Sequence, residues 1–174
     1  MTVAALLEDL KHPWRHGEHV DGRGLTFEET LNLDGLEVRG FDLSGAVFKA
    51  GITARGTQFR GLAWLRGAKV QGPFDLSGAT FRTDFRADAL CAGDAILDGC
   101  TLQGVLSCAG ARLTSLSLRQ ALVMANLTLE GAKIDGNADL TDAEIMGGFW
   151  TAGADIGKLI DQGAQISGRV RLPG

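Results

Sequence analysis

Three histidines lie close together near the start of the chain, and imidazole is a common metal ligand and proton carrier. His12 and His16 are four residues apart, which would place both rings on one face of a helix, and His19 adds a third imidazole. Pro13 interrupts any helix that would align them, and no cysteine lies nearby to complete a site. We therefore predict a solvated segment here, with no bound metal and no cofactor.

The three cysteines could in principle bind zinc or supply a thiolate nucleophile. Cys91, Cys100 and Cys108 are separated by nine and eight residues, a spacing that matches no zinc motif. Cys100 takes a position where alanine usually stands in the repeat described below, which indicates packing in the core, whereas Cys91 is expected to be exposed. No histidine lies within residues 23–174 to activate a thiol, so nucleophilic catalysis is not expected.

Acidic residues are plentiful but scattered along the chain. Asp42 and Asp75 stand at the same place in two copies of the segment Phe-Asp-Leu-Ser-Gly-Ala. Matching positions in a repeat indicate stabilisation of a turn or ladder rather than a pair of catalytic carboxylates. The glycine-rich turns match neither the P-loop nor the dinucleotide-binding pattern. These observations predict that the protein is not an enzyme.

The elements that would position these side chains belong to one repeat of about 11 residues. Large apolar residues recur at this spacing: Phe48, Phe59, Val70, Phe81, Leu90, Leu102, Leu113, Val123, Ile134, Ile145, Ile156 and Ile166. A small residue, usually after a glycine, stands two positions before most of them: Ala46, Thr57, Ala68, Ala79, Cys100, Ala111, Ala121, Ala132, Ala143, Ala154 and Ala164. Such a fixed period predicts a solenoid, in which each unit buries its apolar side against its neighbours.

Short strands are the only regular structure that fits this repeat. Each half-unit alternates an inward, an outward and an inward residue before a glycine-rich turn, as in Ala138-Asp139-Leu140. Helical repeats are excluded because so short a unit cannot hold two helices, and a glycine in each helix would cost about 1 kcal/mol.

The pattern small-x-large-x-x is carried by residues 132–136 (Ala-Lys-Ile-Asp-Gly) and 143–147 (Ala-Glu-Ile-Met-Gly). It resembles the A(D/N)Lxx motif of the pentapeptide-repeat family over about four-fifths of the chain. The resemblance implies a right-handed quadrilateral β-helix with the large residue in its core. Unit lengths here alternate between five and six residues, which gives about 22 residues per coil rather than the family's ~20.

We therefore predict an all-β solenoid: a right-handed parallel β-helix with four sides and a short N-terminal capping helix. A three-sided right-handed β-helix is the alternative fold. The expected division is residues 1–22 as a capping segment and residues 23–174 as a solenoid of 11-residue units. Val3, Leu6 and Leu10 fall on one helical face, and Pro13 should end that helix.

The C-terminal coil is expected to be open, because no comparable capping segment follows it in the sequence. Ile156, Ile166 and Leu172 lead to this end. An open end with unpaired strand edges favours association of two copies, so we predict a homodimer through the C-terminal coil.

Composition indicates a globular protein: of 174 residues, 45% are hydrophobic and 22% are charged. The longest apolar stretches are too short for a membrane span, and the first residues lack the basic segment of a signal peptide. An odd number of cysteines argues against a secreted disulfide framework. We interpret the sequence as that of a bacterial-like cytoplasmic protein without a membrane span.

Charge is unevenly distributed along the chain. Residues 40–90 hold seven basic and four acidic residues, whereas residues 91–174 hold six basic and nine acidic ones.

Trp64 and Trp150 occupy equivalent outward positions in the repeat and are predicted to share one side of the rod. The candidate interaction surface therefore comprises Trp64, Trp150, Lys49, Arg55, Arg60, Arg66, Lys69, Asp135, Asp139, Asp142 and Glu144.

Two functions fit a rigid solenoid without a catalytic constellation. The first is a non-catalytic protein–protein interaction or scaffold module, whose partner is another protein and not nucleic acid. The second follows from the family resemblance, since some pentapeptide-repeat proteins bind type II topoisomerases as acidic rods that imitate duplex DNA. A net charge of −4 with a basic N-terminal half makes this chain a poor mimic.

Overall fold

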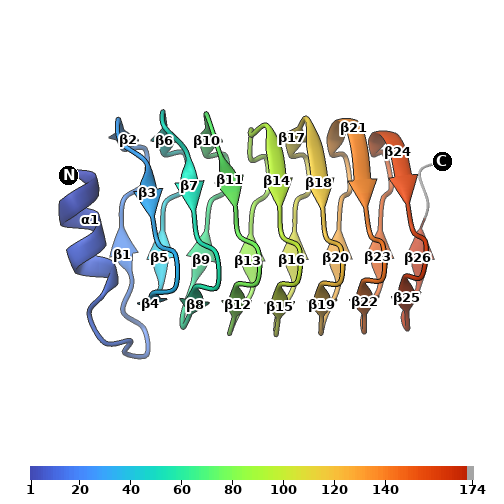
Figure 1. The fold of residues 1–174 in the computed structure, drawn as a ribbon, viewed down its shortest axis with the longest axis horizontal. Coiled ribbons are helices and arrows are strands. Elements are labelled where there is room, and N and C mark those ends of the chain that lie inside the picture. Colours follow the sequence, from blue (N-terminus) through green and yellow to red (C-terminus); the bar gives the residue numbers. More distant parts are fainter. Residues whose placement is uncertain (172–174) are drawn as a thin grey trace.

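The computed structural model describes residues 1–171, which form a right-handed parallel β-helix of about seven turns with one helix at its N-terminal end (Figure 1). Paired residues on successive coils lie 21 or 22 positions apart, as in Val20 with Phe41 and Phe41 with Ala63. Each coil passes through four short extended segments. These segments stack into four columns, so the four-sided form of the predicted fold is confirmed.

Columns 1 and 4 are continuous sheets. Column 1 contains β1 (Val20–Asp21), β5 (Phe41–Asp42), β9 (Ala63–Trp64), β13 (Phe85–Arg86), β16 (Leu106–Ser107), β20 (Leu127–Thr128), β23 (Phe149–Trp150) and β26 (Val170–Arg171). Column 4 contains β4 (Glu37–Val38), β8 (Gln58–Phe59), β12 (Thr80–Phe81), β15 (Thr101–Leu102), β19 (Leu122–Val123), β22 (Glu144–Ile145) and β25 (Gln165–Ile166).

Columns 2 and 3 are neighbours that merge in the last coils. Column 2 contains β2 (Thr26–Phe27), β6 (Val47–Phe48), β10 (Lys69–Val70), β17 (Arg112–Leu113) and the first parts of β21 (Lys133–Asp139) and β24 (Asp155–Ile160). Column 3 contains β3 (Leu31–Asn32), β7 (Ile52–Thr53), β11 (Phe74–Asp75), β14 (Asp94–Ile96), β18 (Ser115–Ser117) and the remaining parts of β21 and β24.

The core is one continuous cluster of inward side chains that runs the length of the rod. The small and large residues predicted to face inward are buried from Ala46 to Ile145 and half-buried in the last coil. Phenylalanines stack between coils: the ring centroids of Phe59 and Phe81 are 4.4 Å apart, and those of Phe27 and Phe48 are 5.1 Å apart. Adjacent coils therefore bury each other's apolar side, as the repeat requires.

The position assigned to Leu90 in the repeat is wrong by two residues. Cys91 pairs with Lys69 on one side and with Arg112 on the other, so Leu90 lies in register with Ala68 rather than with Val70. Leu90 is fully buried at the small-residue place, and Ala92 takes the place of the large residue. This exchange keeps the volume of the coil nearly constant, because one large and one small side chain still fill it.

The solenoid begins at Val20, before residue 23 where its boundary was expected. β1 already pairs with β5 in full parallel register. The repeat pattern is weak in the first coil because Leu25 and Leu36 stand in register with the small residues Ala46 and Thr57 of the next coil. Both leucines are half-buried against the core at the end of the rod, where no earlier coil restricts their volume.

Helix α1 (Val3–Leu10) lies across the N-terminal end of the rod beside β1 (Figure 1). Thr2 caps it, since its hydroxyl oxygen accepts a hydrogen bond from the Ala5 amide at 3.1 Å. Val3, Leu6 and Leu10 are buried, so the helix covers the apolar side of the first coil. The predicted capping helix is therefore present.

We expect Ala111→Leu to lower the free energy of unfolding by about 1–3 kcal/mol, because Ala111 is fully buried between neighbouring coils. Ala132→Leu should behave in the same way, and urea denaturation measures both. The matched control is Arg112→Leu, which places the same side chain on the exposed outward neighbour and should change stability by less than about 0.5 kcal/mol. An unchanged midpoint for both alanine variants would contradict the assigned register.

Deletion of residues 1–14 should cause aggregation, because it uncovers the apolar side of the first coil and the edges of its strands. Leu6→Asp tests the same contact with a point change, since Leu6 has no exposed surface. Ala5→Asp on the exposed face of α1 is its control. Size-exclusion chromatography and thermal unfolding provide the measurements. A soluble and equally stable deletion variant would show that α1 does not protect the coil.

Candidate interaction surface

The two tryptophans of the solenoid share one face of the rod. Trp64 in β9 and Trp150 in β23 both belong to column 1, with four strand steps between them. At the spacing of parallel strands this separation is about 19 Å. Each ring takes the outward position between two buried residues, so column 1 presents both tryptophans on the same side.

An arginine accompanies each tryptophan. Trp64 pairs in the ladder with Arg86, and Trp150 pairs with Arg171. The Arg171 guanidinium carbon lies 5.2 Å from the centroid of the Trp150 ring, and that of Arg66 lies 6.0 Å from the Trp64 centroid. These are cation–π distances, and both tryptophans are half-buried rather than freely exposed.

A hollow of about 460 Å³ opens beside the first tryptophan, lined by Trp64, Arg66, Arg86 and Asp88. Further along column 1 the outward residues become small. Ser107 is buried and its hydroxyl donates a hydrogen bond to the Asp88 carboxylate. Beyond Arg86, the outward residues Ser107 and Thr128 are therefore small and do not project between the two tryptophan–arginine pairs.

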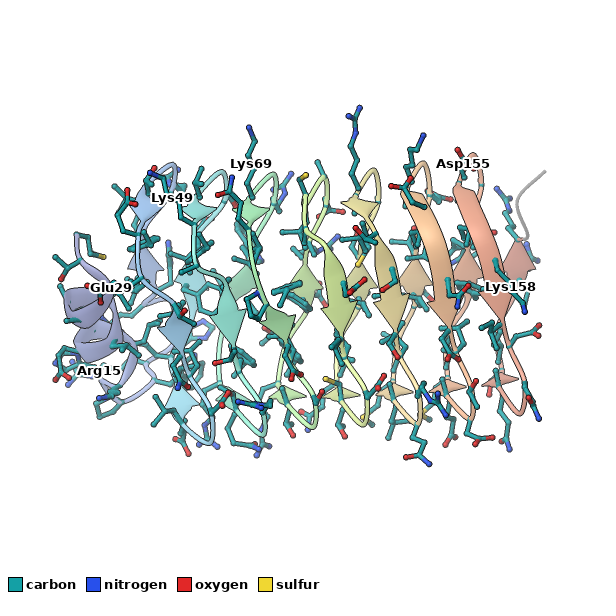
Figure 2. All side chains as sticks on the ribbon, turned by 45° about the horizontal axis from the view of Figure 1, so that its top comes forward. Arg15, Glu29, Lys49, Lys69, Asp155 and Lys158 are labelled. Carbon is teal, nitrogen blue, oxygen red and sulfur yellow. The ribbon has the colours of Figure 1, made fainter. Side chains whose placement is uncertain are left out.

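The basic candidate residues do not gather on one face. Four of the five are paired with acids from a neighbouring coil: Lys49 Nζ with Glu28 Oε1 at 2.8 Å, Arg55 Nη2 with Asp34 Oδ2 at 2.8 Å, Arg60 Nε with Glu37 Oε1 at 3.5 Å, and Arg66 Nε with Asp88 Oδ2 at 3.8 Å. Lys69 makes no ion pair within residues 1–171, and Figure 2 shows it on the same edge as Lys49. Most of the excess positive charge is therefore locally neutralised.

The acidic candidate residues are also spread around the rod. Glu144 lies in column 4, Asp139 in column 3 and Asp142 in the turn between these columns, whereas Asp135 lies near column 2. Asp139 accepts hydrogen bonds from the amide and hydroxyl of Thr141, which lower the pKa of its carboxyl group. The structure thus brings Trp64, Trp150 and Arg66 onto one face, whereas the other charged candidates are distributed around the rod.

The repeated aspartates stabilise turns, as expected. Asp75 Oδ1 accepts hydrogen bonds from the Ser77 amide at 3.0 Å and from its hydroxyl at 2.5 Å. Asp42 Oδ1 accepts the equivalent bond from the Ser44 amide at 3.0 Å. These local bonds occupy one oxygen of each carboxylate.

Ion pairs between coils also shift carboxylate pKa values. Burial alone would raise the pKa of Asp34, but hydrogen bonds from Arg55 lower it overall. Nearer the capped end, hydrogen bonds from Arg23 lower the pKa of Asp21 to about 2. Both carboxylates are therefore ionised at neutral pH.

The cysteines divide into one exposed and two buried thiols, Cys91 being the exposed one. Cys100 donates a hydrogen bond through Sγ to the Leu76 carbonyl at 2.9 Å. Burial raises the pKa of both Cys100 and Cys108 to about 12. The predicted packing role of Cys100 and the exposure of Cys91 are confirmed.

The histidines lie around the segment that follows α1, and they are not brought together as ligands. His12 Nδ1 lies 3.2 Å from the Asp9 carbonyl oxygen, and the ring of His16 meets the edge of Trp14. Within residues 1–171, no three His, Cys, Asp or Glu side chains are grouped as a metal ion would require.

In the part of the chain that the structure describes, residues 1–171, no helix has the length and apolar character needed to cross a membrane.

Comparison of the sequence with protein-family models gives no match, and comparison with curated proteins gives none either. Assignment to the pentapeptide-repeat family therefore stays a prediction based on the motif.

One thiol per chain should react rapidly with dithiobis(nitrobenzoate) in the folded protein, and all three should react in denaturant. The reason is that the buried thiols, with pKa values of about 12, are almost fully protonated at pH 8, and the reagent cannot reach them. Cys91→Ser should remove the rapid reaction, whereas Cys100→Ser should leave it unchanged. A second rapidly reacting thiol in the folded protein would contradict the assigned burial.

Proposed function

We propose that this protein is a non-catalytic interaction module that binds another protein through column 1. The observation that supports this proposal best is the pair of tryptophan–arginine contacts on one face, four coils apart. Tryptophan and arginine are the residue types most enriched among those that dominate binding energy. The hollow beside Trp64 offers a concave place for a partner side chain.

Recognition on this face must use side chains. The strands of column 1 are paired on both edges from β5 to β23, so their backbone groups are already bonded within the sheet. A partner therefore cannot add a strand along the face. Small outward residues, Ser107 and Thr128, lie between Arg86 and Trp150, so a partner surface that contacts both ends meets no large side chain between them.

Trp64→Ser and Trp150→Ser, singly and together, test this proposal. Each should weaken binding of a partner captured by cross-linking to the wild-type protein by about 30-fold, the effect of losing a dominant contact. The matched control is Ile96→Ser, which removes a half-buried outward side chain from column 3. Equal binding by the tryptophan variants would contradict a column 1 interface, and equal loss in the control would indicate general damage to the fold.

The alternative is a DNA mimic that binds a type II topoisomerase, and the charge arrangement gives it less support. Mimicry requires a continuous run of negative charge with the spacing of duplex phosphates. Here the acids of the first coils, such as Glu28 and Asp34, are paired with Lys49 and Arg55. A supercoiling assay with a purified topoisomerase distinguishes the alternative, because a column 1 module should leave that activity unchanged.

We also propose a cytoplasmic location, supported by the three unpaired cysteines.

We further propose that two copies of the protein associate through the last described coil. Ile156, Leu159 and Ile166 are only half-buried there, and Val170 is 45% exposed. The strands β24, β25 and β26 each pair on one edge only within residues 1–171. Leu172, which was expected to contribute, lies outside the described residues.

Light scattering should therefore show a concentration-dependent dimer, because pairing of two such ends covers apolar surface and strand edges. Ile166→Asp should shift the equilibrium to the monomer. Gln165→Asp, on the exposed outward neighbour, is the control and should leave the dimer in place. A monomer at high concentration would contradict this association.

A further inference from the structure

Arg39 lies at the corner between β4 and β5, beneath the segment that connects α1 to β1. We call this segment, residues 11–19, the strap. The Arg39 amide donates a hydrogen bond to the Leu10 carbonyl at 3.0 Å. Its side chain is only 18% exposed, so the guanidinium is largely withdrawn from water. A buried guanidinium needs acceptors within the protein or from a ligand.

The hydrogen-bond donors of the Arg39 side chain are not all matched by acceptors. Arg39 Nε is buried and has no hydrogen-bond partner within residues 1–171. Glu18 is the acid within ion-pair distance: its Oε2 lies 3.6 Å from Arg39 Nη1, and its Oε1 lies 3.9 Å from Arg15 Nη1. Both distances exceed the usual range for an N–H···O hydrogen bond. Glu18 therefore stands between two guanidinium groups without forming a close bond to either.

A hollow of about 240 Å³ opens at this place, lined by His12, Pro13, Arg15, Glu18 and Arg39. A water molecule occupies roughly 30 Å³ in the liquid, so the hollow accommodates a small oxyanion together with several waters. Two guanidinium groups and an imidazole face a single carboxylate, which leaves the site with positive charge. Figure 2 shows Arg15 beside α1 at the capped end of the rod, where a ligand can reach it from solvent.

We propose that the strap hollow is a binding site for a phosphate group, held by Arg39 and Arg15 with His12 at its edge. The planar donor fork of arginine matches the oxygens of phosphate, and charge-assisted bonds of this kind are among the stronger ones in proteins. A tetrahedral phosphate offers more acceptor oxygens than a carboxylate, enough for both guanidinium groups. In the hollow it would accept hydrogen bonds from the Nη atoms of both arginines, in place of their long contacts to Glu18.

The competing explanation is that Arg39 only holds the strap in place through Glu18. The two explanations predict different effects of the Glu18→Gln substitution on phosphate affinity. If Glu18 is the partner that Arg39 needs, Glu18→Gln loosens the strap and creates no anion affinity. If Glu18 competes with a bound anion, Glu18→Gln removes a repelling charge and tightens phosphate binding.

Calorimetric titration with inorganic phosphate, at ionic strength held constant with sodium chloride, tests the site. We expect saturable binding of one phosphate per chain, weakened about tenfold or more by Arg39→Gln and strengthened several-fold by Glu18→Gln. Arg82→Gln is the matched control, because Arg82 is exposed on the same corner two coils further along and should not affect binding. Absence of saturable binding, or unchanged affinity in Arg39→Gln, would overturn the proposal.

Further titrations distinguish an effect on phosphate binding from an effect on folding, and they identify the chemical class of the ligand. Arg15→Gln removes the more exposed guanidinium, so it should weaken phosphate binding without changing the melting temperature. O-phosphoserine in place of inorganic phosphate distinguishes a site for a phosphate ester from one for the free ion. Acetate should bind at least tenfold more weakly than phosphate. Equal affinity for acetate would overturn the assignment to phosphate.

Discussion

Parallel hydrogen bonding between successive coils, in strict register, is the interaction on which the rest of the structure depends. Most strands are two residues long, and none could persist alone. Each is held because the same segment of the next coil lies directly beside it, 21 or 22 residues away in sequence. Register in turn requires every inward position to keep a compatible volume. Leu90 and Ala92 show how a coil departs from the usual sizes: one change is balanced by the other within the same column.

The same register governs the outer surface. Side chains at equivalent outward positions of neighbouring coils come within contact distance, so charges far apart in sequence form ion pairs. Glu28 and Lys49 are one example, and Asp34 and Arg55 are another. A count of charges along a stretch of sequence therefore overstates the electrostatic potential at the surface of a solenoid, because it ignores ion pairs between coils. The relevant comparison is between positions one coil apart, and it shows local neutralisation where the linear count indicated a basic region.

The sequence was sufficient for the fold because its period and its small and large inward residues follow directly from coil stacking. The start of the solenoid was placed at residue 23 rather than at Val20, because Leu25 and Leu36 weaken the repeat pattern of the first coil. The shared face of Trp64 and Trp150 was also predictable, since it depends on counting units. The arginines over their rings and the hollow beside Trp64 were not, because they depend on side-chain conformation across coils.

A regular β-helix gives a ligand little to recognise, because its backbone groups are bonded between coils and its turns repeat. Specific recognition must come from departures from the repeat, and two of them are physically connected here. A Cβ atom at Gly61 would lie 2.7 Å from Trp14 Nε1, so the strap rests directly on this glycine. Gly61 lies two residues before β9, the strand that carries Trp64. The strap therefore contacts the turn that leads into β9. The N-terminal segment is in this way both a cover for the first coil and a neighbour of the face proposed to bind a partner.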